Sequence, residues 1–189
     1  MARKVRVYIA ASLDGYIARE DGDISWLDSV SRPGEDYGYE DFIDTIGAVI
    51  MGRKTYDKVL SFGGEFPHEG RDCYVLSRTR TGKDEHVTYF NGAIEELIER
   101  LKQESGKDIF VDGGAEAIHL LREKGLIDSY TISIIPILLG KGIHLFNETE
   151  PEIPLTLTGS KTFASGLVQL NYVPTAKKSN GKRAPKYIC

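Results

Sequence analysis

The chain has 189 residues, a length that fits one domain with a substantial hydrophobic core. Its formal net charge of -4 at pH 7 argues against a general nucleic-acid-binding protein. No stretch has the length of a membrane span or the pattern of a signal peptide, and the two cysteines and four histidines lack the spacing of disulfide or metal sites, so we expect a cytoplasmic protein without a metal.

Up to about residue 125, short apolar runs typical of buried strands alternate with amphipathic helical patterns. We expect strands over residues 5–12, 48–51, 73–76, 87–90 and 109–111, and helices over 36–46, 54–60, 93–104 and 115–124. Asp14-Gly15 indicates a turn after the first strand, and the Gly- and Pro-containing segments 22–34 and 62–71 indicate loops. Gly125 fits the position that follows the end of a helix.

Beyond that glycine the expected strands follow one another without helices between them. They cover residues 129–139, 155–158 and 167–173, and Pro136 inside the first of them indicates a sheet edge or a bulge. The sequence therefore predicts an α/β fold with a mixed, mostly parallel central sheet, flanking helices and C-terminal antiparallel hairpins. We expect residues 1–175 to form a single domain and 176–189 a basic polar tail or connecting loop, and an antiparallel edge strand suits a homodimer.

Three strand ends carry groups that suit phosphate, because Gly, hydroxyl and basic residues there expose backbone N–H groups and cations. These junctions are Gly52-Arg53-Lys54-Thr55, Ser77-Arg78-Thr79-Arg80 and Asp112-Gly113-Gly114-Ala115-Glu116. Three of them in one small domain indicate a ligand with more than one phosphate, such as a dinucleotide. They match neither the Gly-x-Gly-x-x-Gly fingerprint nor a Walker A loop.

Each junction also has an alternative interpretation that involves no ligand. Arg53 and Lys54 oppose the dipole at a helix start unless an anion is present, but they could simply be solvated. Arg78 could select the 2′-phosphate of NADP, or it could belong to a polar turn. Gly113 and Gly114 would let the backbone approach a pyrophosphate closely, or they could form a plain tight turn.

Together with Ser12-Leu13-Asp14-Gly15-Tyr16-Ile17-Ala18, these junctions resemble the dihydrofolate reductase-like superfamily over nearly the whole chain. Three further segments resemble the branch that holds the reductase domain of bifunctional riboflavin-biosynthesis enzymes (RibD C-terminal-like) and its stand-alone relatives. They are residues 22–27, 135–142 and 145–146.

The resemblance implies that NADPH lies across the C-terminal ends of the strands, with residues 14–23 as a flexible lid. Ala11 and Ile17 would border the nicotinamide, and Ser77 and Arg78 would hold the 2′-phosphate. The other implied cofactor residues would hold phosphate or frame the pyrophosphate, and they are Gly52, Arg53, Lys54, Thr55, Gly113, Gly114, Ala115 and Glu116.

The substrate side departs from the better-known members of the superfamily. The Asp-Asp-Pro segment and following Arg of the riboflavin-pathway enzymes are absent, and Trp26 stands alone where dihydrofolate reductase has a Trp-rich loop. Counting back from Met51 places Asp36 at the pterin-binding acid, with Glu40 beside it. We therefore expect Asp36 to be catalytic and Trp26, Asp36 and Glu40 to bind substrate. The alternatives are that Asp36 only stabilises a helix start and that Trp26 only packs the lid.

The function that follows is an NADPH-dependent reductase that transfers a hydride to an unsaturated bond of a small heterocyclic substrate, pterin-like or pyrimidine-like. One alternative is the reductase of 5-amino-6-ribosylaminouracil phosphate in riboflavin synthesis, which the absent Asp-Asp-Pro segment disfavours. Another is a nucleotide-binding module without catalysis.

Overall fold

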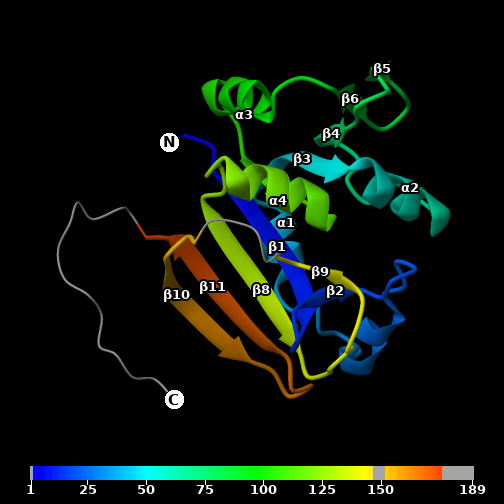
Figure 1. The fold of residues 1–189 in the computed structure, drawn as a ribbon, viewed down its shortest axis with the longest axis vertical. Coiled ribbons are helices and arrows are strands. Elements are labelled where there is room, and N and C mark those ends of the chain that lie inside the picture. Colours follow the sequence, from blue (N-terminus) through cyan, green and yellow to red (C-terminus); the bar gives the residue numbers. More distant parts are fainter. Residues whose placement is uncertain (1, 147–151, 176–189) are drawn as a thin grey trace.

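The structure is a computed structural model that describes residues 2–146 and 152–175. Its centre is a nine-stranded sheet in the order β10-β11-β8-β1-β7-β3-β4-β6-β5 (Figure 1). The strands are β1 (Val5–Ser12), β3 (Ile46–Gly52), β4 (Asp72–Leu76), β5 (Gly82–Lys83), β6 (Thr88–Phe90), β7 (Asp108–Val111), β8 (Ser129–Ile135), β10 (Leu155–Thr162) and β11 (Val168–Pro174). The strands from β8 to β6 in this order run parallel, whereas β5, β11 and β10 pair antiparallel with their neighbours. The predicted mixed, mostly parallel sheet is confirmed.

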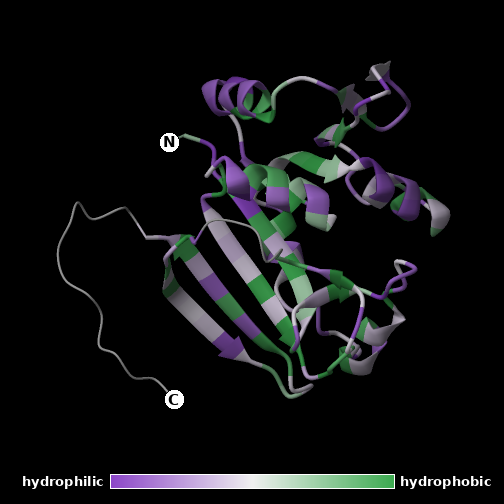
Figure 2. Cartoon of the chain, in the orientation of Figure 1, coloured by the Kyte–Doolittle hydropathy of each residue, from purple (hydrophilic) through white to green (hydrophobic). Residues whose placement is uncertain are grey.

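The central strands read as continuous apolar runs because helices cover both faces of the sheet. On one face, α3 (Ile94–Gln103) and α4 (Ala115–Glu123) pack on β1, β3 and β7, and Figure 2 shows the division of α3 into a hydrophobic and a hydrophilic side. The other face is covered by α1 (Tyr39–Ile43), α2 (Arg53–Ser61) and the loop between α2 and β4. Val49, Ile50 and Met51 of β3 are completely buried between these two layers.

The helix expected over residues 36–46 is wrong in extent. Tyr37 and Gly38 adopt left-handed backbone angles, with φ of 58° and 84°, so the helix α1 begins only at Tyr39. Ile46 already belongs to β3, so α1 has a single five-residue stretch. Local apolar spacing predicted a longer helix because it does not register backbone breaks of this kind.

Two other expectations are corrected. The segment 22–34, expected to be a loop, contains a 3-10 helix η1 (Ser25–Val30) whose Trp26 and Val30 side chains are buried. The strand expected over 129–139 ends at Ile135, directly before Pro136, whose missing N–H cannot serve a sheet ladder.

Short strands escaped prediction because two or three residues carry no periodic signal. β2 (Tyr16–Ala18) pairs antiparallel with β9 (Ile143–His144) in a separate ribbon, and β5 also lacks such a signal. The turn at Gly125 is confirmed, with a φ of 64° after α4. The expected tail 176–189 lies outside the described residues, and among those described no helix has the length and apolar character to cross a bilayer.

Candidate active site

The three predicted phosphate junctions lie at one edge of the sheet. β7, β3 and β4 are direct neighbours and run parallel, so the loops that follow them leave the sheet at the same edge. Gly52 at the end of β3 donates its N–H to the carbonyl oxygen of Gly113 at 3.2 Å. Gly52 is also in register with Leu76, the residue before Ser77. The fold therefore brings together residues that lie far apart in the sequence.

The first and third junctions are joined by direct hydrogen bonds. The N–H of Gly114 donates to the hydroxyl of Thr55 at 2.8 Å, and Lys54 pairs with Glu116 at 3.0 Å across the exposed rim. A Cβ added at Gly114 would lie 2.8 Å from the Thr55 hydroxyl, and Gly113 has a φ of 96°. Both positions therefore favour glycine, and Ala115 begins α4 directly behind them.

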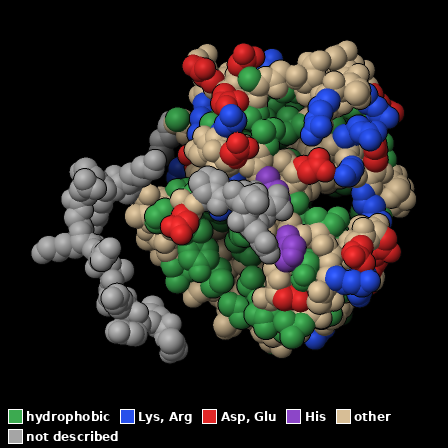
Figure 3. Space-filling view, viewed as in Figure 1, with side chains coloured by type: hydrophobic (Ala, Val, Ile, Leu, Met, Phe, Trp, Pro, Cys, Tyr) green, Lys and Arg blue, Asp and Glu red, His purple; other side chains and the backbone are tan. Residues whose placement is uncertain are grey.

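The cations of the first two junctions have different surroundings. Arg53 and Arg80 both lie near Asp57, at 3.5 Å and 3.9 Å, so their charges are partly compensated. In contrast, the exposed Arg78 has no hydrogen-bond or ion-pair partner among residues 2–146 and 152–175. Figure 3 shows that Lys and Arg side chains gather over α2 and the neighbouring strands, beside a hollow in the surface. The Ser77 hydroxyl accepts hydrogen bonds from the backbone N–H groups of Arg80 and Thr79, and these bonds stabilise the turn that it begins.

The turn after β1 is fastened to the turn after β8. Asp14 accepts hydrogen bonds from the Ser12 hydroxyl at 2.5 Å and from the amides of Leu139 and Gly140 at 3.1 Å and 2.7 Å. Desolvation raises the pKa of Asp14, but these hydrogen bonds outweigh it and lower the pKa to about 2. Its role in the structure is to anchor this turn. Ala11, buried at the end of β1, and the half-buried Ile17 in β2 lie on either side of the turn.

The three predicted substrate residues have different surroundings. Both carboxylate oxygens of the exposed Asp36 accept backbone N–H groups, from Gly38 at 2.9 Å and Glu40 at 2.7 Å, and these bonds lower its pKa. This geometry supports the alternative of a helix-start cap for Asp36, and its role as a proton donor stays a prediction. Glu40 is exposed to solvent. Trp26 is only 4% exposed and packs with Val30 against β8 residue Ile135, as a core side chain would.

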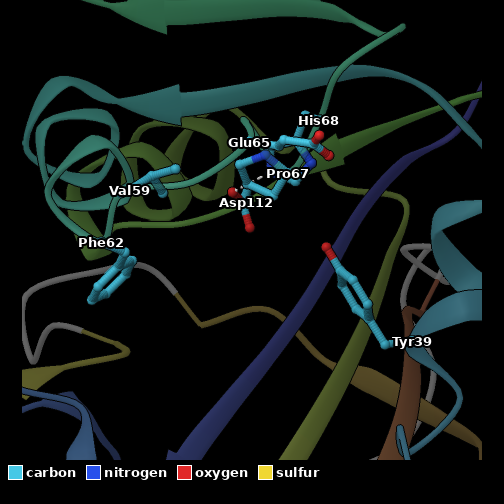
Figure 4. Close-up of a pocket in the computed structure, with 8 residues that line it drawn as sticks. Tyr39, Val59, Phe62, Glu65, Pro67, His68 and Asp112 are labelled. Atoms are coloured by element: carbon cyan, nitrogen blue, oxygen red, sulfur yellow. Dashed lines mark hydrogen bonds and ion pairs between the residues drawn. The ribbon is translucent and has the colours of Figure 1, made fainter.

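A cavity of about 340 Å³ opens beside the third junction (Figure 4). It lies between the start of α1, the end of α2, the following loop and the end of β7. Its lining residues are Tyr39, Val59, Phe62, Gly63, Glu65, Pro67, His68 and Asp112. Asp112 belongs to the wall of the cavity and directly precedes Gly113, so the cavity and the predicted pyrophosphate turn share one strand end.

The polar groups of this cavity are held in fixed positions. Nε2 of the buried His68 lies 2.7 Å from a carboxylate oxygen of Asp112. The hydroxyl of Tyr39 points across the cavity toward Asp112 (Figure 4). Burial and the nearby Asp112 charge raise the pKa of Tyr39 to about 12, so its hydroxyl stays protonated at neutral pH.

Sequence reasoning missed most of these cavity residues. His68 lies in a loop without periodicity, and its partner Asp112 is 44 positions away, so no local pattern joins them. Asp112 did carry a usable signal, because it directly follows a buried parallel strand, where side chains of α/β proteins often meet ligands.

Comparisons with known proteins identify the family to which this chain belongs. The model of the RibD C-terminal domain family matches residues 3–169. The chain is 45% identical over 174 residues to the uncharacterised protein YwjB of Bacillus subtilis (strain 168), covering 92% of this chain and 99% of YwjB.

Solved structures agree. A crystal structure from Shewanella sp. PV-4, assigned provisionally to riboflavin biosynthesis, has 34% identity and a TM-score of 0.84, covering 93% of this chain and 100% of that one. The Thermotoga maritima diaminohydroxyphosphoribosylaminopyrimidine deaminase/5-amino-6-(5-phosphoribosylamino)uracil reductase shares the fold at 16% identity and a TM-score of 0.68, with 92% of this chain and 57% of that one covered. The chain therefore belongs to the family of the RibD C-terminal domain.

Proposed function

We propose that this protein is an NADPH-dependent reductase that transfers a hydride to an unsaturated bond of a small heterocyclic substrate. The observation that carries the proposal is the meeting of three phosphate-suited junctions at one sheet edge, beside a cavity that shares Asp112 with them. Membership of the RibD C-terminal domain family supports an oxidoreductase at a coarse level. The name of the Thermotoga relative includes a reductase of a pyrimidine compound.

The residues at this edge fit a dinucleotide with a 2′-phosphate. A Cβ built on Gly52 meets nothing within 4 Å, so there is open space in front of the β3 end. Gly113 and Gly114 remove side chains at the start of α4, where backbone N–H groups favour an anion. Arg78 has no partner within the described ranges 2–146 and 152–175, so its guanidinium could meet a phosphate without first breaking an ion pair seen there.

Bound NADPH would supply the hydride, and the protein would supply binding, orientation and a dry environment. Residues of the first and third junctions would hold the phosphates, and Ala11 and Ile17 would border the nicotinamide. The cavity beside Asp112 would then hold the substrate next to the reacting end of the cofactor. Tyr39 keeps its proton at neutral pH, so it would act as a hydrogen-bond group at this wall.

Two measurements test this function. Calorimetry should detect NADPH binding to the full chain, and the absorbance of NADPH should fall when a reducible pterin, pyrimidine or quinone is added. Tight NADPH binding without turnover of any compound would favour the alternative of a nucleotide-binding module. Absence of NADPH binding would overturn the proposal.

We also propose that the protein is a homodimer. β10 forms one edge of the sheet, and its outer side has no partner strand within the described part of the chain. Leu155 and Leu157 on this strand are 39% and 52% exposed, and exposed apolar groups on a free strand edge favour association. Sedimentation equilibrium that gives the mass of one chain would contradict this assignment.

A further inference from the structure

The cavity beside Asp112 combines apolar walls with acceptor groups and lacks cations. Val59, Phe62 and Pro67 supply apolar surface, and Tyr39 adds a second aromatic ring. The charged side chains that line it are the carboxylates of Glu65 and Asp112, together with the titratable His68, and no Lys or Arg belongs to its lining. A concave site with apolar walls and a few fixed polar groups is typical of sites for small ring compounds.

Asp112 keeps one oxygen free for a ligand. Its Oδ2 lies 2.7 Å from Nε2 of His68, and its Oδ1 has no hydrogen-bond partner in the part of the chain that the structure describes. The side chain is 22% exposed, so it reaches solvent at the cavity wall. A carboxylate only accepts hydrogen bonds, so the group that meets Oδ1 must be a donor such as a ring N–H or an amino group.

His68 fixes the orientation of this carboxylate. Its ring is 2% exposed and is packed edge-on against Phe66 and Phe110, with centroid distances of 5.7 Å and 6.0 Å. Because the carboxylate must accept, Nε2 of His68 donates to it. Nδ1 is buried and has no hydrogen-bond partner among the described residues. Among the described residues, Asp112 is therefore the hydrogen-bond partner that compensates the burial of this polar ring.

We propose that this cavity binds a planar, unphosphorylated heterocycle whose N–H or amino groups donate to Asp112, with His68 as the positioning residue of that carboxylate. The inference rests on the proposed function, since it names the substrate class of the same site. The proposed ligand lacks a phosphate, and in this it differs from the phosphoribosyl compound in the name of the Thermotoga relative.

The exclusion of phosphate follows from charge. A phosphate ester carries about -1.5 to -2 charges at neutral pH, and it would sit beside two carboxylates with no lining cation to compensate it. Arg71 acts electrostatically on Tyr39, but its guanidinium donates to the carbonyl oxygen of Ile43 at 3.1 Å and does not line the cavity.

The test is calorimetric titration of the full chain, with and without saturating NADPH, using four probes. 2,4-Diaminopteridine and 1,3-dimethyllumazine share a ring system, but only the diamino compound carries hydrogen-bond donors. Cytidine and cytidine 5′-monophosphate differ only in the phosphate. We expect diaminopteridine to bind about tenfold or more tighter than dimethyllumazine, because only its amino groups can donate a charge-assisted hydrogen bond to Asp112. The monophosphate should bind no better than cytidine.

Variants assign the effect to named groups. Asp112→Asn should remove the preference for diaminopteridine. Glu69→Gln should keep it, because it neutralises an exposed carboxylate next to His68 in sequence that lies outside the cavity lining. His68→Leu should weaken diaminopteridine binding, and His68→Gln, which retains an N–H donor, should restore it. Because this rescue depends on the donor, a merely structural role for the ring would not produce it.

The results also separate this inference from the proposed function. Failure of NADPH to bind would refute the proposed reductase function. The probes titrated without cofactor would still report whether the cavity binds a heterocycle. Tighter binding of the monophosphate than of cytidine, or an unchanged diaminopteridine affinity in a folded Asp112→Asn protein, would overturn the inference even if NADPH binds.

Discussion

The backbone N–H of Gly114 donates a hydrogen bond to the hydroxyl of Thr55 at 2.8 Å, across 59 positions of sequence. This contact joins the start of α2 to the start of α4, so two of the three predicted phosphate junctions form one structural unit. The nearby pair of Lys54 and Glu116 is largely exposed and contributes little. The geometry of the proposed cofactor groove therefore depends on Thr55.

Replacing Thr55 should lower stability according to whether the hydroxyl is kept. Thr55→Val leaves the partly buried Gly114 amide without an acceptor, which should lower the free energy of unfolding by about 1–3 kcal/mol. Thr55→Ser retains the acceptor and should stay close to the unmodified protein. Denaturant unfolding measures both, and equal stability of the two variants would show that this bond does not hold the junctions together.

Gly114→Val should weaken NADPH binding by ~2 kcal/mol or more, about 30-fold in Kd. A side chain at this position blocks close approach to the backbone, and its Cβ would also lie 2.8 Å from the Thr55 hydroxyl. Gly159→Ala is the control, since an added Cβ there meets only an Asn171 side-chain atom, at 3.7 Å. Unchanged NADPH affinity in folded Gly114→Val would remove the pyrophosphate assignment.

Arg78 should determine the preference for NADPH over NADH. A charge-assisted contact to the 2′-phosphate is worth roughly 1.5–3 kcal/mol, so Arg78→Ala should reduce the preference by about tenfold or more. Arg80→Ala should do less, because Arg80 is already engaged with Asp57 and Tyr89. Competition binding of the two cofactors measures the ratio. Equal affinity for both in the unmodified protein would refute this role of Arg78.

The parts of the fold that could be predicted are those with a local signal. The apolar run of β3 and the glycines that follow β3 and β7 are visible in the sequence, and parallel order then places their ends together. The candidate cavity could not be predicted in this way. The contact of His68 with Asp112 depends on the path of an irregular loop, and no periodicity describes that path.

The misjudged surroundings of Asp36 have a similar cause. Helical spacing placed Asp36 on one face with Tyr39, but the left-handed Gly38 breaks the helix between them. Apolar periodicity reports which side chains are buried, and it does not report a single backbone inversion. Asp36 therefore precedes the helix and binds its first amides instead.

Substitutions of Asp36 distinguish a cap from a proton donor. Asp36→Ala should lower the free energy of unfolding, because the amides of Gly38 and Glu40 lose their acceptors. Asn has a single acceptor oxygen and can keep only one of the two bonds. If Asp36 is a proton donor, the Asp36→Asn variant should in addition lose about 10²–10⁴-fold in turnover. Glu40→Gln is the control on the neighbouring exposed acid. Full turnover by Asp36→Asn would end the proton-donor hypothesis.

Asp14 should make the stability of the protein sensitive to acid. Its pKa is about 2 in the folded chain, because the hydrogen bonds from Ser12, Gly140 and Leu139 outweigh desolvation, against about 3.9 for an unfolded aspartate. The lower folded pKa means that Asp14 stabilises the fold fully above about pH 4, and that this stabilisation is lost as the pH falls through about 2.

Asp14→Asn should therefore be less stable at pH 7, and its stability should decline less steeply below pH 4. Chemical unfolding at a series of pH values tests this, with Asp21→Asn in the next turn as a control of equal charge change. Parallel pH profiles for the unmodified protein and Asp14→Asn would show that the bonds of Asp14 to Leu139 and Gly140 do not stabilise the fold.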